Sequence, residues 1–246
     1  MSSIVNLATA LILYYAHIIC SYSYPYLNQR ESILKLLSEL GEDPPRVMGD
    51  STLRADIDAM NQVLQSRSND SLLNTPQAND KKVSTLLRLY ADLVLVLHFS
   101  KQHLIASVSL KMIDITIKNG MTPTAPLSFA YYGELLAYTG QIEGGCRLGR
   151  LALKLVEKNA SSLKYKSAVV LVVYQTIFWY NEPLQSVAES HLMGYKAGQQ
   201  LGDLLFSSWN LQLSIILNYI GGHNLITLQK AIKECSMYAD IQQQSL

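Results

Sequence analysis

One stretch decides the fold: YTGQIEGGCRLGRLALKLVEK, residues 138–158. It begins with a turn in which Gly140 can take a positive φ without a Cβ clash. Apolar residues then recur at positions 148, 151, 152, 155 and 156, which is the spacing of an amphipathic α-helix. Charged residues take the opposite face, namely Arg147, Arg150, Lys154 and Glu157. The stretch therefore predicts a turn followed by a half-exposed helix.

The same order of helix, turn and helix recurs along the chain. Turns of similar composition lie near positions 99, 140, 181 and 222, at a spacing of about 41 residues. A fixed period of roughly 20–50 residues is typical of stacked repeat arrays. In each pair the first helix is apolar nearly all round and the second is amphipathic, as two packed layers require. We predict an all-α fold, an antiparallel helix-pair solenoid with about 10–11 helices.

We expect a single helical-repeat domain over residues 1–246, and the sequence divides it into three parts. Residues 4–66 predict irregular helices, because prolines at positions 25, 44 and 45 interrupt them. Residues 67–79 are polar and predict a long loop. Residues 80–243 predict regular helix pairs, with helices over 80–97 and 101–119 and a last apolar stripe from 228 to 239.

Single residues predict several helix ends, and one segment is compatible with either a strand or a helix. Gly120 should end one helix, Thr124 should cap the next, and Gly202-Asp203 should end one helix and cap another. Residues 167–180 contain four valines that favour a strand, whereas the repeat phase and the apolar length favour a buried helix. We predict helix there. The glycines at 144, 145, 194 and 198 should let neighbouring helices approach closely.

Composition limits the classes of partner. The chain has 20 Lys and Arg against 19 Asp and Glu, a net charge of +1, which argues against a strongly basic nucleic-acid surface. Three cysteines, Cys20, Cys146 and Cys235, form no CxxC pair and indicate buried thiols in a reducing compartment. We therefore expect no nucleic-acid partner and a cytoplasmic location.

The segment Ile4–Cys20 is strongly apolar and leaves two interpretations open. It is only about 17 residues long, at the lower limit for a membrane span, and no basic residues precede it. We expect a buried first helix and no membrane attachment. The alternative is a signal or anchor segment.

The sequence predicts no catalytic residue, no cofactor and no metal site. Residues 144–151, GGCRLGRL, have phosphate-loop glycine spacing but lack the Lys and the Ser/Thr that bind phosphate and magnesium. The five histidines include no HExxH motif, and no serine lies in a GxSxG motif.

Several segments resemble one region of known proteins: SLKM (109–112), NGMTP (119–123), SFAYYG (128–133), GRLALKL (149–155), GYKAG (194–198), GD (202–203), and LLSELG (36–41) with the following Pro44-Pro45. They look like the helical region downstream of the AAA-type ATPase module in large multidomain signalling kinases, both hybrid histidine kinases and serine/threonine kinases. That region is similar to tetratricopeptide arrays. The nucleotide-binding and kinase motifs of such proteins are missing from this sequence, so none of their catalytic residues can be assigned here.

The resemblance implies a non-catalytic interaction or coupling module of a signal-transduction protein. Its partners would be other proteins or sister domains of the same protein, and Arg147, Arg150 and Lys154 are the candidate partner-binding residues. One alternative is that the chain is a segment of a multidomain ATPase or kinase whose catalytic domains lie elsewhere. Another is a helical ligand-binding domain or enzyme with an apolar pocket.

Overall fold

A computed structural model describes residues 29–100, 102–224 and 228 of the chain, and its regular structure is helical apart from one isolated bridge. This confirms the all-α class. The first described helix covers residues 29–39. The later elements are α2 (Asp50–Gln65), α3 (Asn69–Leu73), α4 (Lys81–Ser100), a 3-10 turn (Gln102–Leu104), α5 (Ile105–Asn119), α6 (Ala125–Tyr138), α7 (Ile142–Lys158), a 3-10 segment (Ala160–Tyr165), α8 (Lys166–Val172), α9 (Leu184–Leu201) and α10 (Leu204–Ile220).

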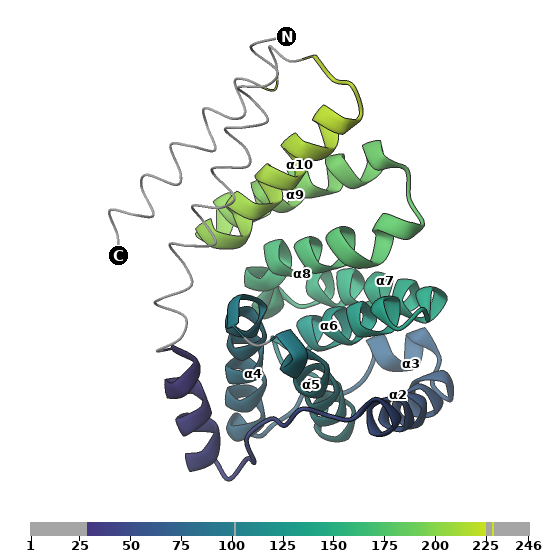
Figure 1. Ribbon diagram of the computed structural model, residues 1–246. Coiled ribbons are helices and arrows are strands. Elements are labelled where there is room, and N and C mark those ends of the chain that lie inside the picture. Colours follow the sequence, from purple (N-terminus) through teal and green to yellow (C-terminus); the bar gives the residue numbers. More distant parts are fainter. Residues whose placement is uncertain (1–28, 101, 225–227, 229–246) are drawn as a thin grey trace.

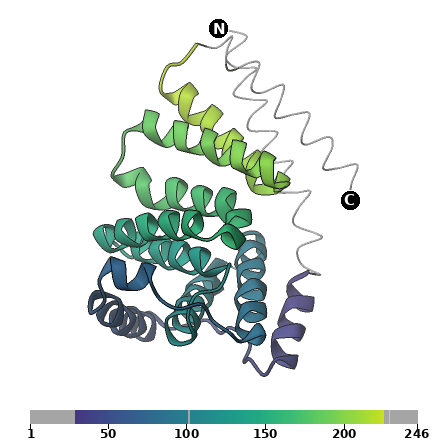
Figure 2. The same ribbon diagram turned by 180° about the vertical axis from the view of Figure 1, so that it is seen from behind.

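From α4 onward, helices that follow one another in the chain pack against one another. This holds for α4 with α5, α6 with α7, and α9 with α10, while α8 contacts both α6 and α7. In both views α2 and α3 lie at one end of the molecule and α9 and α10 at the other (Figures 1 and 2). One continuous apolar core runs from the helix at residues 29–39 to the end of the α8 segment.

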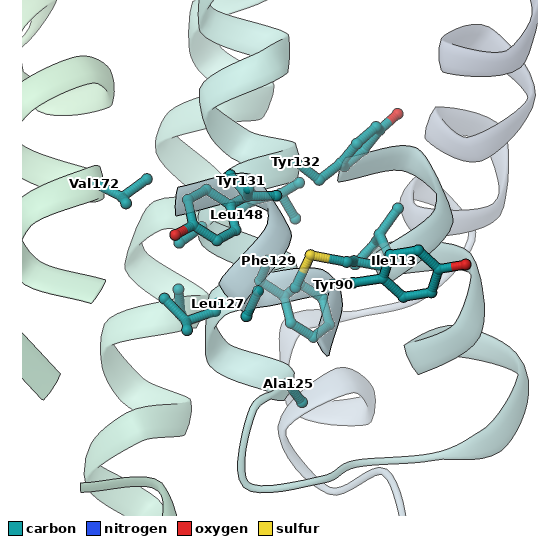
Figure 3. Close-up of a cluster of buried hydrophobic side chains, with 14 of the residues drawn as sticks. Tyr90, Ile113, Ala125, Leu127, Phe129, Tyr131, Tyr132, Leu148 and Val172 are labelled. Carbon is teal, nitrogen blue, oxygen red and sulfur yellow. The ribbon is translucent and has the colours of Figure 1, made fainter. Parts of the chain in front are cut away.

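The two kinds of helix that the pattern predicted are seen in α6 and α7. Every residue of α6 from Ala125 to Ala137 is buried, whereas α7 buries one stripe and exposes Arg150 and Lys154. Tyr131 and Tyr132 of α6 point to opposite sides of that helix (Figure 3). The Tyr132 hydroxyl donates to the Ile57 carbonyl at 3.1 Å and so attaches α6 to α2.

Glycine lets α6 and α7 approach closely, as predicted. A Cβ on Gly145 would lie 2.7 Å from the carbonyl oxygen of Gly133, closer than real Cβ atoms come to other atoms. On α9, a Cβ on Gly194 or Gly198 would likewise lie 2.7 Å from side-chain atoms of α10. Small residues therefore set the spacing at both helix pairs.

The segments that enter α4 and α6 are joined by backbone hydrogen bonds. Met121 N–H donates to the Pro76 carbonyl at 2.9 Å, and Ala78 N–H donates to the Met121 carbonyl at 2.7 Å. Gly120 ends α5 as predicted, with φ of 101°. Only glycine fits there, because that φ is unfavourable for other residues and a Cβ would lie 2.7 Å from the Pro76 oxygen.

The predicted polar loop at residues 67–79 differs from the structure, which has the short helix α3 there. Ser68 caps it, since its side chain accepts a hydrogen bond from Ser71 N–H at 3.1 Å. Leu72 explains the difference, because this apolar side chain is fully buried in the core and its burial orders the segment.

Residues 166–180 are helical, as predicted, but irregular. The α-helical turns of α8 pass into a π-helical turn at Val173–Ile177 and then a 3-10 turn at Phe178–Tyr180. The valines face the core on several sides, so burial outweighs their strand preference. At the next boundary Gly202 is left-handed (φ 74°) and the Asp203 side chain accepts from Phe206 N–H at 3.2 Å, as predicted.

Some predictions fall outside the described residues. They are the apolar segment Ile4–Cys20, most of the last stripe at residues 228–239, Cys20 and Cys235. Cys146 is described, and it is buried and has a free thiol. Among the helices that the structure describes, none has the length and apolar character needed to cross a membrane.

Candidate functional site

Arg147, the first predicted partner-binding residue, makes internal contacts. Its guanidinium donates to the carbonyl oxygens of Leu64 at 3.1 Å and Arg67 at 2.6 Å, and to Asn69 Oδ1 at 2.8 Å. Leu64 lies in the last turn of α2, where backbone carbonyls lack intrahelical partners, Arg67 follows that helix, and Asn69 begins α3. Arg147 therefore joins α7 to the α2–α3 connection.

Arg150 and Lys154 remain on the exposed face of α7. The Arg150 guanidinium carbon lies 5.4 Å from the centre of the Phe178 ring, within the range of a cation–π contact. Because Arg147 is directed at backbone carbonyls, the three predicted residues do not form one exposed cationic surface.

A groove between α4, α6, α8 and α10 has the strongest features of a binding site. Its volume is about 480 Å³, and the four helices can be located in Figure 1. Four aromatic side chains line it, and two of them, Phe206 and Trp209, meet edge to face at 5.7 Å between ring centres. The described lining consists of Leu95, His98, Gln102, Tyr131, Glu134, Tyr138, Leu171, Val172, Gln175, Thr176, Phe206, Trp209, Gln212 and Leu213.

Two polar side chains in this groove are buried with an unused hydrogen-bonding atom. Glu134 is 4% exposed, and its Oε2 atom has no hydrogen-bond partner within the described structure. Gln212 is 2% exposed, and its Nε2 atom also has none. Each such buried group costs about 1–3 kcal/mol relative to a paired one. A ligand that paired with both would recover that cost.

Burial controls the charge of Glu134. Desolvation raises its pKa from 4.5 to about 8, while the hydroxyl of Thr176 acts in the opposite direction. The carboxyl group therefore carries a proton at neutral pH. Burial also raises the pKa of Tyr131, and the nearby Glu134 and Asp92 raise it further.

His98 is another ionisable group in the lining of the groove. Burial lowers the pKa of His98, and its Nδ1 atom lies 2.8 Å from the Val94 carbonyl oxygen, so the neutral ring donates there. None of the described lining residues is Lys or Arg. At neutral pH the described lining is thus uncharged, and Glu134 carries its one carboxyl group.

A second hollow lies against the α5–α6 connection and has fewer features of a ligand-binding site than the Glu134 groove. It has a volume of about 590 Å³ and contains the unpaired hydroxyl of Thr122. Its lysine, Lys158, is already bonded to the Leu73 carbonyl at 2.8 Å and to Asn74 Oδ1 at 2.7 Å. The described lining of this hollow has no buried ionisable group that lacks a partner, so we select the Glu134 groove.

Neither a metal site nor an activated cysteine is found in the described part of the chain. No group of three or more His, Cys, Asp and Glu side chains there is arranged to hold a metal ion. Burial raises the pKa of the Cys146 thiol, although Arg150 and Asn181 oppose the shift. This keeps Cys146 in the unreactive thiol form at neutral pH.

No family model, curated protein or solved structure matches this chain. The tetratricopeptide-like arrangement and the link to signalling kinases therefore remain hypotheses.

The groove was missed in the sequence although one signal pointed to it. Glu134 is the only charged residue between Asn119 and Glu143. A carboxylate within so apolar a helix is rarely buried unless it has a partner, and such positions are often functional. The sequence does not show that Gln212 and Trp209, about 75 positions further along, face the same groove.

Proposed function

We propose that this protein is a non-catalytic, tetratricopeptide-like binding module whose groove between α4, α6, α8 and α10 holds a small organic ligand. The observation that carries the proposal is the pair of buried, unpartnered atoms Glu134 Oε2 and Gln212 Nε2 in one apolar cavity. This supports the apolar-pocket alternative raised by the sequence.

Cavity size and lining support a ligand of modest size. Small-molecule sites have volumes of about 300–1,000 Å³ and combine apolar walls with a few polar groups. The Glu134 groove has about 480 Å³ and this composition. Its ligand should have an apolar body and one polar group that reaches Glu134.

Trp209 offers a direct test, because the chain has only two tryptophans and Trp209 lines the groove. The other, Trp179, is 48% exposed outside it. In the Trp179→Phe variant all tryptophan fluorescence comes from Trp209. Small aromatic and aliphatic compounds that raise the melting temperature should change this fluorescence with the same concentration dependence.

A groove-filling substitution provides the control. Leu213→Trp places a large side chain in the groove, whereas Leu192→Trp makes the same change on the exposed side of α9. Stabilisation by ligand should be lost in the first variant and kept in the second. Equal stabilisation of both variants would place the ligand elsewhere and contradict the proposal.

A second candidate function is protein–protein coupling in a cytoplasmic signalling protein, as the family resemblance implies. The favouring observation is a group of exposed aromatic residues, Tyr138, Trp179 and Tyr180, whose exposed fractions are 48–68%. Burial raises the pKa of Tyr138, and the nearby Glu134 and Tyr180 raise it further, so Tyr138 and Tyr180 lie close together. The Arg150 guanidinium lies over the ring of Phe178, the residue before Trp179. Tyr, Trp and Arg are the residue types enriched at binding hot spots.

This candidate includes the possibility that the chain is one segment of a multidomain kinase. Its test is binding to such sister domains, measured with the unmodified chain and with a Trp179→Ser/Tyr180→Ser variant. We expect at least a tenfold loss of affinity, which corresponds to about 1.4 kcal/mol. Unchanged affinity would remove this surface from the function.

A further inference from the structure

We infer that the ligand of the Glu134 groove is an organic cation, an amine whose ammonium group pairs with the Glu134 carboxylate between the aromatic side chains. The inference rests on the proposed ligand-binding function and specifies its ligand class. It follows from the charges, the aromatic lining and the unpaired atoms of the groove.

Charge complementarity selects a cation. Glu134 is the only carboxyl group among the described lining residues, and no lysine or arginine lies beside it there. A ligand anion would meet this carboxyl group with no described countercharge. A ligand cation would supply the partner that Glu134 Oε2 lacks.

The aromatic lining favours the same class. Tyr131, Tyr138, Phe206 and Trp209 line the groove around Glu134. The faces of aromatic rings carry negative potential and attract ammonium groups, and tryptophan does so most strongly. The apolar part of the amine would occupy the remaining cavity between Leu95 and Leu213.

Gln212 completes the site. An ammonium group has three donors, whereas a carboxylate oxygen and an amide oxygen are acceptors. A half turn of the Gln212 amide exchanges its nitrogen and oxygen and brings Oε1 to the place of the unpaired Nε2. Glu134 and Gln212 would then each accept one ammonium hydrogen.

Binding of an ammonium ion should release a proton. Before binding, Glu134 is a neutral carboxylic acid at pH 7, since its pKa is about 8. The amine arrives already protonated and stays so. Pairing ionises the carboxyl group, and its proton leaves to solvent, so the complex contains one carboxylate and one ammonium group.

Affinity should therefore rise with pH up to about 8 and then level off while the amine remains charged. Other titratable groups near Glu134 are His98 from α4, Tyr131 and Tyr138 from α6, and Asp92 of α4 beside Tyr131. His98 is already neutral, and the pKa values of both tyrosines are raised, so neither the histidine nor the two tyrosines change charge near pH 8. Burial also raises the pKa of Asp92, while Arg88 opposes the shift. The described residues of α8 and α10 that line the groove include no titratable group.

Three probes of matched shape test the inference: naphthylmethylamine, naphthylmethanol and naphthoate. Isothermal titration calorimetry at pH 7 should show the amine binding at least about tenfold more tightly than the alcohol, and naphthoate weakest. Repeating the amine titration in phosphate and in Tris, which differ in ionisation enthalpy, should show release of close to one proton per amine bound.

Two variants locate the effect. Glu134→Gln should weaken amine binding about tenfold or more, abolish proton release and leave the alcohol within about twofold. Glu143→Gln makes the same change at an exposed position of α7 and should alter none of these values. Circular dichroism checks that both variants are folded.

The outcomes distinguish failure of the cation inference from failure of the proposed ligand-binding function. Alcohol or naphthoate binding as tightly as the amine, or an amine affinity unaffected by Glu134→Gln, would overturn the cation inference and leave the groove as a ligand site. If none of the three probes binds, the cation inference is overturned. If the wider compound panel also leaves Trp209 fluorescence unchanged, the groove function falls as well.

Discussion

His191 donates a hydrogen bond from Nδ1 to Asn210 Oδ1 at 2.8 Å, and the same Asn210 side chain donates to the Ser167 carbonyl at 2.9 Å. The three residues belong to α9, α10 and α8 and are all buried. Burial lowers the pKa of His191, so its ring is neutral and its one proton can occupy Nδ1. This polar contact fixes how the last described helices pack on α8.

Asn210→Ala should lower the free energy of unfolding by about 2–3 kcal/mol, because it leaves buried groups on His191 and Ser167 without a partner. Asn218→Ala is the matched control. Asn218 lies on the same helix, and within the described residues its side chain bonds to Ser214, one turn away, so its loss should cost less than about 1 kcal/mol. Urea unfolding of both variants measures the difference, and equal losses would show that the three-helix contact is not stabilising.

Gly145→Ala should destabilise the protein by about 1–3 kcal/mol, because the new Cβ would lie 2.7 Å from the Gly133 carbonyl oxygen and force α6 and α7 apart. Gly144→Ala is the adjacent control. Its Cβ would meet only the end of the Leu136 side chain at 3.2 Å, and alanine favours a helix by about 1 kcal/mol over glycine. We therefore expect Gly144→Ala to be neutral or stabilising in thermal melts. Similar effects of the two substitutions would contradict the close approach.

Glu134→Gln should stabilise the protein, and the gain should depend on pH. The folded pKa is about 8 and the reference value is 4.5, so from about pH 4.5 to 8 the unfolded chain has lost a proton that the folded chain keeps. The decrease in the free energy of unfolding that Glu134 causes therefore grows as pH rises across that interval, by up to about 1.4 kcal/mol per pH unit.

The measurement is the difference in unfolding free energy between the Glu134→Gln variant and the unmodified protein at pH 5 and at pH 8. The difference should be small at pH 5 and several kcal/mol larger at pH 8. Comparing the two chains at each pH cancels the titration of His98 and His191. A difference that does not change with pH would mean that Glu134 is ionised in the folded protein.

Arg147→Gln should lower stability by about 1–3 kcal/mol, because three acceptors at the α2–α3 connection lose their charged donor. Lys154→Gln, on the exposed face of the same helix, should change stability by less than about 0.5 kcal/mol. Thermal melts of the two variants decide whether Arg147 is structural. If Arg147→Gln were as stable as the unmodified protein, its role as a partner-binding residue would regain support.

The sequence predicted the helices whose boundaries depend on local chemistry. The stripe at residues 148–156, the left-handed Gly202 and the Asp203 cap each follow from spacing or from one residue's backbone preference. Residues 69–73 were assigned to a loop because Ser, Asn, Asp, Thr and Pro dominate the stretch 66–79 that contains them. The burial of Leu72 depends on α7 and the rest of the core, which a local pattern does not contain.

The candidate site was less predictable for the same reason. Arg147 was expected on a free face, yet its acceptors lie about 80 positions earlier in the chain. Glu134 stood out only as a lone charge, and its groove is formed by helices from four separate parts of the sequence. Burial, and with it the raised pKa, exists only after those helices have packed.

The parallel contact between Gln77 and Met121 has a consequence for how the chain could gain residues in evolution. The chain leaves α5 beside the point where it entered α4, so residues 78–120 begin and end at nearly the same place. A duplication of this unit would leave the ends of the flanking chain already adjacent, with no new linker to span a gap. A duplicated unit would keep this closure only with glycine at position 120 in each copy.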